Sequence, residues 1–287
     1  GHSLCMASIH PEILCDYVPN KSAAFGYDTR SAFCPSNEAN YELLDDIIAE
    51  ICALFDSEYI HIGGDEVDMS QWRLCPRCQA FMREHNMSST DQLQVYFMDR
   101  ISDMVAKHGK KPAVWNEAIE GGKLDPDTRV YGWEGIKECR AAAAQGYPTV
   151  IIAGQYFYFD MKQTPREPGH DWAAIFDSKK VYGFTPVGVG FTPEEEANVL
   201  GLESTFFSEA YASREPESPD YMHYQTFPRM VSFAEVAWVD SDERDWDSFY
   251  RRMVDHYARL DAMGVAYRLM PPDVKYDGGV LSVAVDD

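Results

Sequence analysis

The sequence lacks several features that mark other classes of protein. It has no uninterrupted apolar run long enough to cross a membrane, and it contains no internal repeat or low-complexity tract. Basic residues are few, since 25 Lys and Arg stand against 47 Asp and Glu, for a formal net charge of -22. This excess of negative charge argues against nucleic acid or an anionic membrane surface as a partner. The remaining composition, 45% hydrophobic and 25% charged over 287 residues, is that of a globular chain with a sizeable core in one or two domains.

Cysteine is also sparse, with seven residues that form no dense disulfide framework. Cys75-Pro-Arg-Cys78 has the spacing of half a zinc site. Neither a second Cys-x-x-Cys pair nor a His-x-His pair stands nearby to complete four ligands. We therefore predict no metal at this segment, with a zinc site as the less favoured alternative.

Five apolar or β-branched runs, separated by segments with helical spacing, predict parallel strands linked by helices in an α/β fold. The strands are expected to start near residues 59, 112, 129, 149 and 202. Ser36-Asn37 and Thr90 are expected to cap helices, and an alanine-rich helix should end at Ala144. Further helices are predicted at 76–85, from Thr192, at 220–237 and at 245–263, with a long polar loop at 161–190.

The segment His61-Ile-Gly-Gly-Asp-Glu66 lies at the end of the first predicted strand and combines two glycines with two adjacent carboxylates. Gly63 and Gly64 allow backbone conformations that other residues avoid, and two adjacent carboxylates, Asp65 and Glu66, come next. At the end of a buried strand the two charges repel and lose solvation, so one of the pair should keep its proton near neutral pH. A proton donor beside a permanent anion suits glycosidic bond cleavage. The plain alternative is a solvated acidic turn.

Aromatic and acidic side chains also gather at the ends of the later strands. Functional residues of parallel barrels cluster at this end of the strands. Aromatic faces can bind the apolar face of a sugar, while carboxylates accept hydrogen bonds from its hydroxyls. One tryptophan at such a position is more often part of the core, but the repeated pattern favours a binding pocket. The residues are Trp115, Glu117, Trp133, Tyr158, Asp160, Phe207 and Glu209.

Together with Gly1-His2-Ser3 and Pro11-Glu12, these motifs resemble family 20 of the glycoside hydrolases, the β-N-acetylhexosaminidases. The likeness runs to about Arg268. It implies a (β/α)8 TIM-barrel fold in which the acid pair ends the fourth strand, so this chain would cover roughly strands four to eight. Residues 1–268 would then form the C-terminal part of the catalytic barrel, and residues 269–287 an extension or linker.

The resemblance also implies a reaction. The enzyme would release terminal β-linked N-acetylglucosamine or N-acetylgalactosamine from glycans, with the substrate's own acetamido oxygen as nucleophile. Glu66 would act as acid and base, while Asp65 would stabilise the oxazolinium-like intermediate. No cofactor is implied, and the parent protein would be secreted, periplasmic or lysosomal. The predicted substrate-binding residues are His2, Trp115, Trp133, Tyr158, Asp160, Phe207 and Glu209.

Several departures keep alternatives open. Phe207 stands where family members usually carry tryptophan, and the first-strand arginine and the aspartate that precedes His2 in the family motif are not in this sequence. Gly1-His2 could instead be a cloning remnant. The alternatives to hydrolysis of terminal sugars are a non-enzymatic carbohydrate-binding or structural fragment and a disaccharide-releasing enzyme of the same fold.

Overall fold

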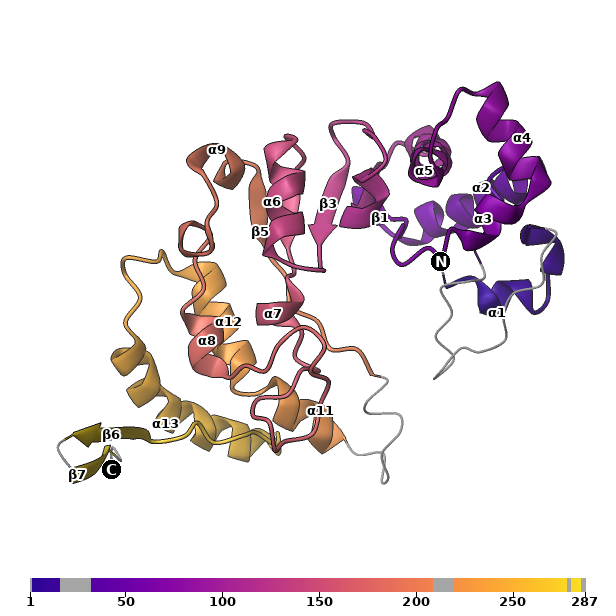
Figure 1. The fold of residues 1–287 in the computed structure, drawn as a ribbon. Helices are drawn as coiled ribbons and strands as arrows, with labels where there is room; N and C mark the ends of the chain where they lie inside the picture. The colour runs from indigo at the N-terminus through magenta and orange to yellow at the C-terminus, as the bar shows by residue number, and fades with distance from the viewer. Residues whose placement is uncertain (1, 16–31, 209–218, 278–279, 285–287) are drawn as a thin grey trace. The chain divides into compact units, whose positions relative to one another are not determined.

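The structure is a computed structural model that describes residues 2–15, 32–208, 219–277 and 280–284. The chain forms two compact units, which are treated separately below (Figure 1). The first unit comprises Gly1–Ile151 with Pro193–Leu200, and the second comprises Ile152–Thr192 with Gly201–Asp287. No helix in the described ranges is long and apolar enough to span a bilayer.

A parallel sheet organises the first unit, as the alternating sequence pattern predicted. Its strands are β1 (Tyr59–His61), β2 (Lys111–Trp115), β3 (Arg129–Gly132) and β4 (Thr149–Ile151), with β5 (Val199–Leu202) following β4 in the strand order. His61 pairs with Ala113, and Trp115 pairs with Tyr131. The first four strands lie where they were predicted. The fifth was predicted to start near residue 202 but ends there, because the aromatic run after Leu202 resembles a strand more closely than Val199-Leu-Gly-Leu does.

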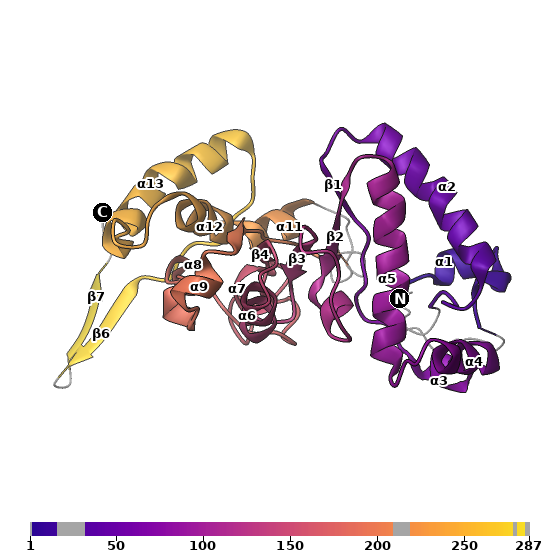
Figure 2. The same cartoon turned by 90° about the horizontal axis from the view of Figure 1, so that it is seen from above.

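Long amphipathic helices cover one face of this sheet. Helices α2 (Glu38–Leu54) and α5 (Thr90–Lys107) pack side by side, as Figure 2 shows. Helix α5 is capped by Ser89, which accepts from the backbone N–H of Gln92, so the prediction of Thr90 as the cap was wrong. The remaining helical segments of this unit are α1 (Leu4–Ala7), η1 (Pro11–Ile13), α3 (Ser70–Leu74), α4 (Pro76–Glu84), η3 (Asn116–Ile119), α6 (Ile136–Ala144) and α9 (Pro193–Glu196).

The core lies between these helices and the sheet. Val114 and Val130 are fully buried in a cluster with Met98 of α5 and Ala142 of α6. Since successive side chains of a strand point to opposite faces, the residues that alternate with these valines face away from the helices. On that face His61, Trp115 and Tyr131 pack against one another, with ring centroids 4.6 to 6.0 Å apart. The strand pattern therefore brings aromatic rings together on the side where a barrel has its interior.

The second unit is mainly helical. Its elements are α7 (Gly154–Phe157), α8 (Ser178–Tyr182), η4 (Val187–Val189), α11 (Pro219–Thr226), α12 (Arg229–Trp238) and α13 (Trp246–Met263), followed by the antiparallel strands β6 (Asp273–Asp277) and β7 (Val280–Ala284). The single helix predicted at 220–237 is wrong. It is divided at Pro228, which has no N–H to continue the helical hydrogen bonds. The predicted loop at 161–190 contains α8 and η4.

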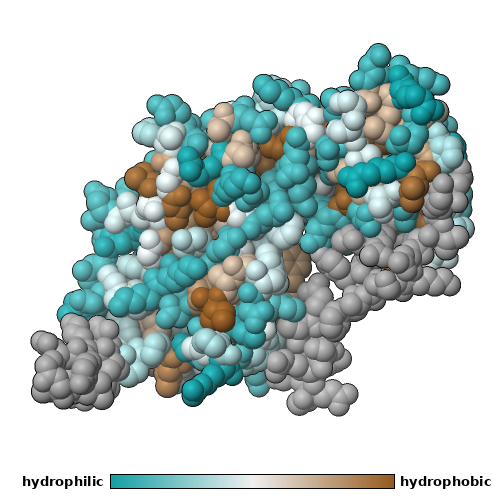
Figure 3. All heavy atoms as spheres, viewed as in Figure 1, coloured by the Kyte–Doolittle hydropathy of each residue, from teal (hydrophilic) through white to brown (hydrophobic). Residues whose placement is uncertain are grey.

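In Figure 3 hydrophobic residues are scattered among predominantly hydrophilic ones on the face shown. Exposed apolar side chains such as Trp238, 91% accessible, are ordinary on protein surfaces when they stand singly. The proposed division at residue 268, with 269–287 as a linker or extension, stays a prediction.

Candidate active site

Two glycines turn the chain from β1 toward the acid pair. Gly63 and Gly64 have φ values of +77° and +100°, which L-residues with a side chain rarely adopt. A Cβ on Gly64 would stand 2.8 Å from the Cβ of Ala118, so this position is also crowded. Glu66 itself has φ +48°, an uncommon conformation for a residue other than glycine. The backbone is thus held in a tight, strained turn where the predicted catalytic residues lie.

His2 joins the two predicted catalytic carboxylates. Its Nε2 atom lies 3.3 Å from Oδ2 of Asp65 and 3.2 Å from Oε2 of Glu66. The hydrogen bonds to Asp65 and then Glu66 raise the pKa of His2 to about 9, against the effect of its burial. His2 is therefore a cation at neutral pH. From the sequence, only the family resemblance assigned these three residues to one site. In the structure they are in contact.

The carboxyl of Asp65 is an anionic member of the pair, which is the state that its expected role in stabilising positive charge requires. Burial by itself would raise the pKa of Asp65, but the hydrogen bond and positive charge of His2 outweigh that effect, and the pKa is lowered. Repulsion and lost solvation within the pair did not show which carboxyl is the anion, and only the family resemblance brought His2 to this site. Asp65 is consequently an anion at neutral pH.

Glu117, a third carboxyl beside the pair, lies in η3 just after β2 and has a raised pKa. Oε1 of Glu117 accepts the backbone N–H of Glu66 at 2.8 Å, and Oε2 accepts the indole N–H of Trp133 at 2.8 Å. Burial raises the pKa of Glu117 to about 7, although both hydrogen bonds favour the anion. Sequence analysis placed Glu117 at a strand end but gave it no role. The sequence feature that could have indicated this role is the position of Glu117 at a strand end, two residues after Trp115.

Asn116 extends this network. Its Oδ1 accepts the backbone N–H of Trp133 at 3.1 Å, and its Nδ2 donates to Oε2 of Glu134 at 2.6 Å. Asn116 is buried, and its two bonds tie the end of β2 to the residues that follow β3. Trp133 is therefore held at both its backbone and its indole nitrogen.

A cavity of about 340 Å³ opens beside the acid pair. Its size falls within the range of pockets that bind small molecules. Glu66 and Glu117 both contribute to its wall, so the cavity adjoins the predicted acid–base residue. The other lining residues are Val67, Asp68, Met69, Gln94 and Glu120.

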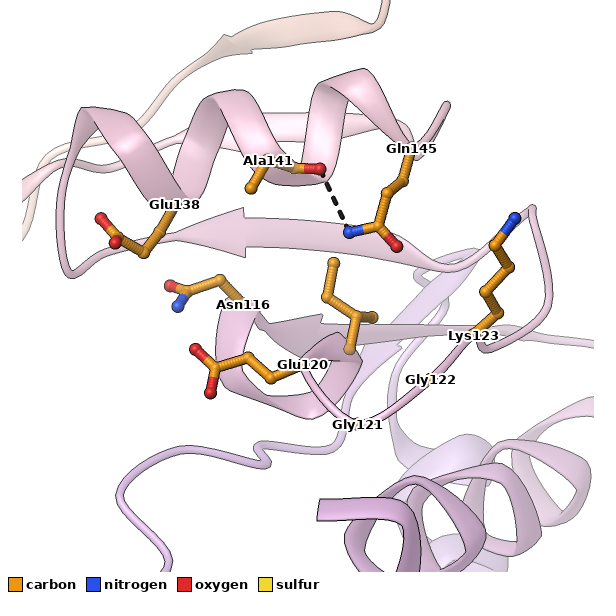
Figure 4. A pocket seen from close by; sticks show the side chains of 9 residues that line it. Asn116, Glu120, Gly121, Gly122, Lys123, Glu138, Ala141 and Gln145 are labelled. Carbon is orange, nitrogen blue, oxygen red and sulfur yellow. Dashed lines mark hydrogen bonds between the residues drawn. The ribbon is translucent and has the colours of Figure 1, made fainter. Parts of the chain in front are cut away.

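A second cavity, of about 510 Å³, lies along helix α6 (Figure 4). Glu138 and Ala141 of α6 line it together with Gln145, which follows the helix, and Nε2 of Gln145 donates to the backbone oxygen of Ala141. None of the predicted site residues lines this cavity. Its size alone does not make it the site.

The remaining predicted residues that the structure describes belong to the second unit. Tyr158 is buried, and its ring packs against Phe207 and Trp172 with centroids 5.3 and 5.5 Å away. Asp160 is 2% exposed, and burial raises the pKa of its carboxyl. Glu209 lies outside the described residues. Because Asp65 and Tyr158 belong to different units, their convergence on one pocket stays a prediction.

Arg229, which sequence analysis did not single out, fixes the backbone around Asp160. It is fully buried and donates to the carbonyl oxygens of Phe159 at 2.6 Å and Met161 at 3.0 Å. It also donates to the carbonyl of Gln225. Burial lowers the pKa of Arg229 to about 9, against the opposing charge of Asp160. The segment that carries Tyr158 and Asp160 is thereby anchored to helix α12.

Among the residues that the structure describes, two groups of side chains have ligand atoms close enough to hold a metal. One is His2 with Asp65 and Glu66. In this group the cationic histidine already supplies the positive charge between the carboxylates. The other comprises Cys15, Cys34, Cys75 and Cys78. Sequence analysis found only the second half of this cysteine group, because Cys15 and Cys34 are far apart in the sequence and form no short motif.

The chain matches known proteins over most of its length. The family described as glycosyl hydrolase family 20, catalytic domain, matches residues 1–241. A β-hexosaminidase of Vibrio furnissii is 30% identical over 240 residues, which cover 82% of this chain and 38% of that protein. The β-hexosaminidase subunit beta of Homo sapiens is 28% identical over 273 residues, covering 93% of this chain and 45% of that protein.

Solved structures agree with these matches. The exo-β-N-acetylglucosaminidase from Vibrio harveyi, in complex with N-acetylglucosamine, is 30% identical with a TM-score of 0.79, over 92% of this chain and 41% of that one. The N-acetyl-β-hexosaminidase of Streptomyces plicatus is 26% identical with a TM-score of 0.75, over 94% and 51%. This chain thus spans between about two fifths and half of the length of these relatives. Its fold is of the (β/α)8 barrel type, and the chain belongs to glycosyl hydrolase family 20.

Proposed function

We propose that this chain carries the acid–base machinery of a β-N-acetylhexosaminidase, which releases terminal β-linked N-acetylglucosamine or N-acetylgalactosamine from glycans. The observation that carries the proposal is the contact of one cationic histidine, His2, with both Asp65 and Glu66 at 3.2 to 3.3 Å. A charged carboxylate and a proton-transferring carboxyl are thereby adjacent at the end of a parallel strand. The relatives named β-hexosaminidase support the same activity.

In the proposed reaction the substrate supplies the nucleophile. Glu66 donates a proton to the leaving oxygen while the acetamido oxygen of the bound sugar attacks the anomeric carbon, and the glycosidic C–O bond breaks. The product of this step is a cyclic oxazolinium ion. Glu66, now a carboxylate, takes a proton from the water that attacks the same carbon, and the bond from that carbon to the acetamido oxygen breaks, so the acetamido group and the proton on Glu66 are both restored.

Asp65 suits the complementary role. Its pKa is lowered, so it is an anion that can accept the acetamide N–H and stabilise the positive charge of the oxazolinium ion. His2 lies against both carboxylates and would regulate the proton on Glu66. The proposed reaction needs a permanent anion and a transferable proton. Asp65 supplies the first and Glu66 the second.

The remaining assignments concern substrate binding. Trp133 and Trp115 would wall the acetamido group and the sugar ring, and Tyr158 would donate to the acetamide oxygen. Phe207, which packs against Tyr158, would provide a smaller stacking surface than tryptophan. Asp160 would bind near the acetamide site, and Glu209 would bind the outer hydroxyls.

Glu66→Gln tests the acid–base role. We expect kcat for chitobiose to fall by about 10²- to 10⁴-fold, because a general acid contributes roughly that much. The fall should be smaller for a dinitrophenyl β-N-acetylglucosaminide, whose leaving group needs little protonation. The exposed Glu42 on helix α2 provides the control variant Glu42→Gln, which should keep the wild-type rate. Unchanged turnover of chitobiose by the Glu66→Gln enzyme would exclude the proposal.

The substrate's part is tested with the unaltered protein. Aryl β-glucosides have a hydroxyl in place of the acetamido group and cannot form the cyclic intermediate. We expect them to be hydrolysed far more slowly than the matching N-acetylglucosaminide. Equal rates on both would show that a protein group is the nucleophile.

A further inference from the structure

Four buried cysteines from three separate segments meet in the first unit. Cys15 ends the first described segment, Cys34 lies shortly before helix α2, and Cys75 and Cys78 lie at the junction of α3 and α4. All four are buried, with exposures between 0% and 5%, and their sulfur atoms all lie within 4.8 Å of one another. The other three cysteines, Cys5, Cys52 and Cys139, are not in this group.

The spacing of the sulfur atoms fits a tetrahedral cage. Sγ of Cys78 lies 3.7 Å from Sγ of Cys15 and 3.6 Å from Sγ of Cys34. A disulfide would bring two sulfurs to about 2.05 Å. Four thiolates at about 2.3 Å from a central zinc ion are separated from one another by about 3.8 Å, the edge of the corresponding tetrahedron. The cluster thus has the dimensions of an ion site rather than of a disulfide.

We propose that Cys15, Cys34, Cys75 and Cys78 bind one structural Zn²⁺ ion. Four thiolates form a soft ligand set that selects Zn²⁺ over Mg²⁺ or Ca²⁺. With four protein ligands no position is left for water or substrate, so such a site stabilises structure and does not catalyse. The ion would also remove most of the cost of burying four thiolates, because each of them would be bound to the metal.

The surroundings of the sulfurs support thiolate ligands. Oγ of Ser36 lies 3.3 Å from Sγ of Cys34 and 3.5 Å from Sγ of Cys78, within reach to donate a hydrogen bond to a ligand sulfur. Cys75 immediately precedes the nine-residue helix α4, whose N-terminal dipole favours negative charge. Trp72, Met82 and Leu93 pack around the group and exclude water.

The site would connect the start of the chain to the segment after the acid pair. Val67 and Met69, which follow Glu66 and line the 340 Å³ cavity, pack against the buried hydrophobic cluster that contains the four cysteines. A zinc ion would join Cys15 and Cys34 to the α3–α4 junction. It would thereby stabilise the hydrophobic cluster against which Val67 and Met69 pack. The metal would therefore hold one wall of the catalytic cavity while lying outside it.

Metal analysis of the purified, reduced protein tests the proposal. We expect about one zinc per chain, released when a mercurial reagent blocks the thiols and then detected with a chromogenic chelator. Replacement of the ion by Co²⁺ should give the strong visible absorption of tetrahedral cobalt thiolate. Iron in place of zinc, or a folded and reduced protein with no metal and no cobalt spectrum, would overturn the proposal.

Variants locate the ion. Cys78→Ser should lower the bound zinc from about one to below about one-tenth per chain, since Cys78 is central to the group. Cys5→Ser, which changes an exposed cysteine, and Cys52→Ser, which changes a buried one elsewhere, should retain the ion. If Cys78→Ser does not fold, the cobalt spectrum of the unaltered protein still decides the question. Equal zinc content in Cys78→Ser and Cys5→Ser would place the ion elsewhere and refute the assignment.

Discussion

Glu117 offers a test of whether a side chain from the end of β2 holds the turn that carries the acid pair. Its carboxylate accepts the backbone N–H of Glu66 and the indole N–H of Trp133, both at 2.8 Å. In Glu117→Gln the side chain keeps its shape, but one of the two oxygens becomes an NH₂ group. That group must then face an N–H donor, so one of the two hydrogen bonds is lost. Glu117 is thus a positioning residue for Glu66 and Trp133.

The size of the effect follows from these contacts. A hydrogen bond to a charged group contributes about 1.5–3 kcal/mol, and a left-handed backbone at a residue such as Glu66 costs about 1–2 kcal/mol. Loss of one bond is therefore enough to let the turn relax. We expect kcat/KM to fall by about 10- to 100-fold, which corresponds to about 1.4–2.7 kcal/mol.

Stability should respond differently from activity. The pKa of Glu117 is raised from 4.5 to about 7, so the folded protein binds this proton more tightly than the unfolded chain does. The resulting stabilisation is complete below about pH 4.5 and is lost as the pH rises through 7. At pH 8 the neutral glutamine avoids the cost of a buried charge, and the variant should unfold at a temperature no lower than the wild type.

Activity measured against pH distinguishes positioning from a general structural role. Wild-type activity should rise as Glu117 ionises near pH 7, because only the carboxylate accepts both donors, and that rise should be absent in Glu117→Gln. Glu58→Gln removes an exposed carboxylate at the other end of β1 and should match the wild type. A folded Glu117→Gln protein with activity within about twofold of wild type and the same pH profile would refute this reasoning.

Two further predictions concern the same turn. The pKa of His2 is raised from 6.5 to about 9, so its contacts with Asp65 and Glu66 stabilise the fold fully below pH 6.5 and are lost as the pH rises through 9; thermal unfolding across pH 6–10 should show this loss in the wild type and not in His2→Gln. Gly64→Ala should destabilise the protein by about 1–3 kcal/mol, because its Cβ would meet the Cβ of Ala118 at 2.8 Å. Gly109→Ala, which shares a positive φ but has open space, should cost less, and equal denaturation midpoints for the two would contradict the steric argument.

Local sequence determined most of the secondary structure. Helices α2, α5 and α13 and the first four strands formed where periodicity placed them, because an amphipathic stripe or a short β-branched run needs only neighbouring residues to be recognised. The errors have equally local causes. Pro228 divides a segment that was predicted as one helix. The aromatic run after Leu202 led to the prediction of the fifth strand there, whereas the strand lies at 199–202.

Part of the site could also be predicted. The Gly-Gly-Asp-Glu turn at 63–66 combines backbone freedom with two carboxylates in one short segment, which is visible in the sequence and matches the family motif. Its protonation could not be predicted from the pair alone. The pKa of Asp65 depends on His2, which is distant in sequence, and the raised pKa of Glu117 depends on its burial in the folded chain.

The sequence by itself determined the α/β class, the family resemblance and the acid pair, since each depends on residues close together along the chain. Only the tertiary structure decided that Glu117 holds Glu66 and Trp133, and that Cys15 and Cys34 meet Cys75 and Cys78. Hydrogen bonds and metal ligation depend on distances in space. Separation along the chain does not specify those distances until the sheet and its helices have packed.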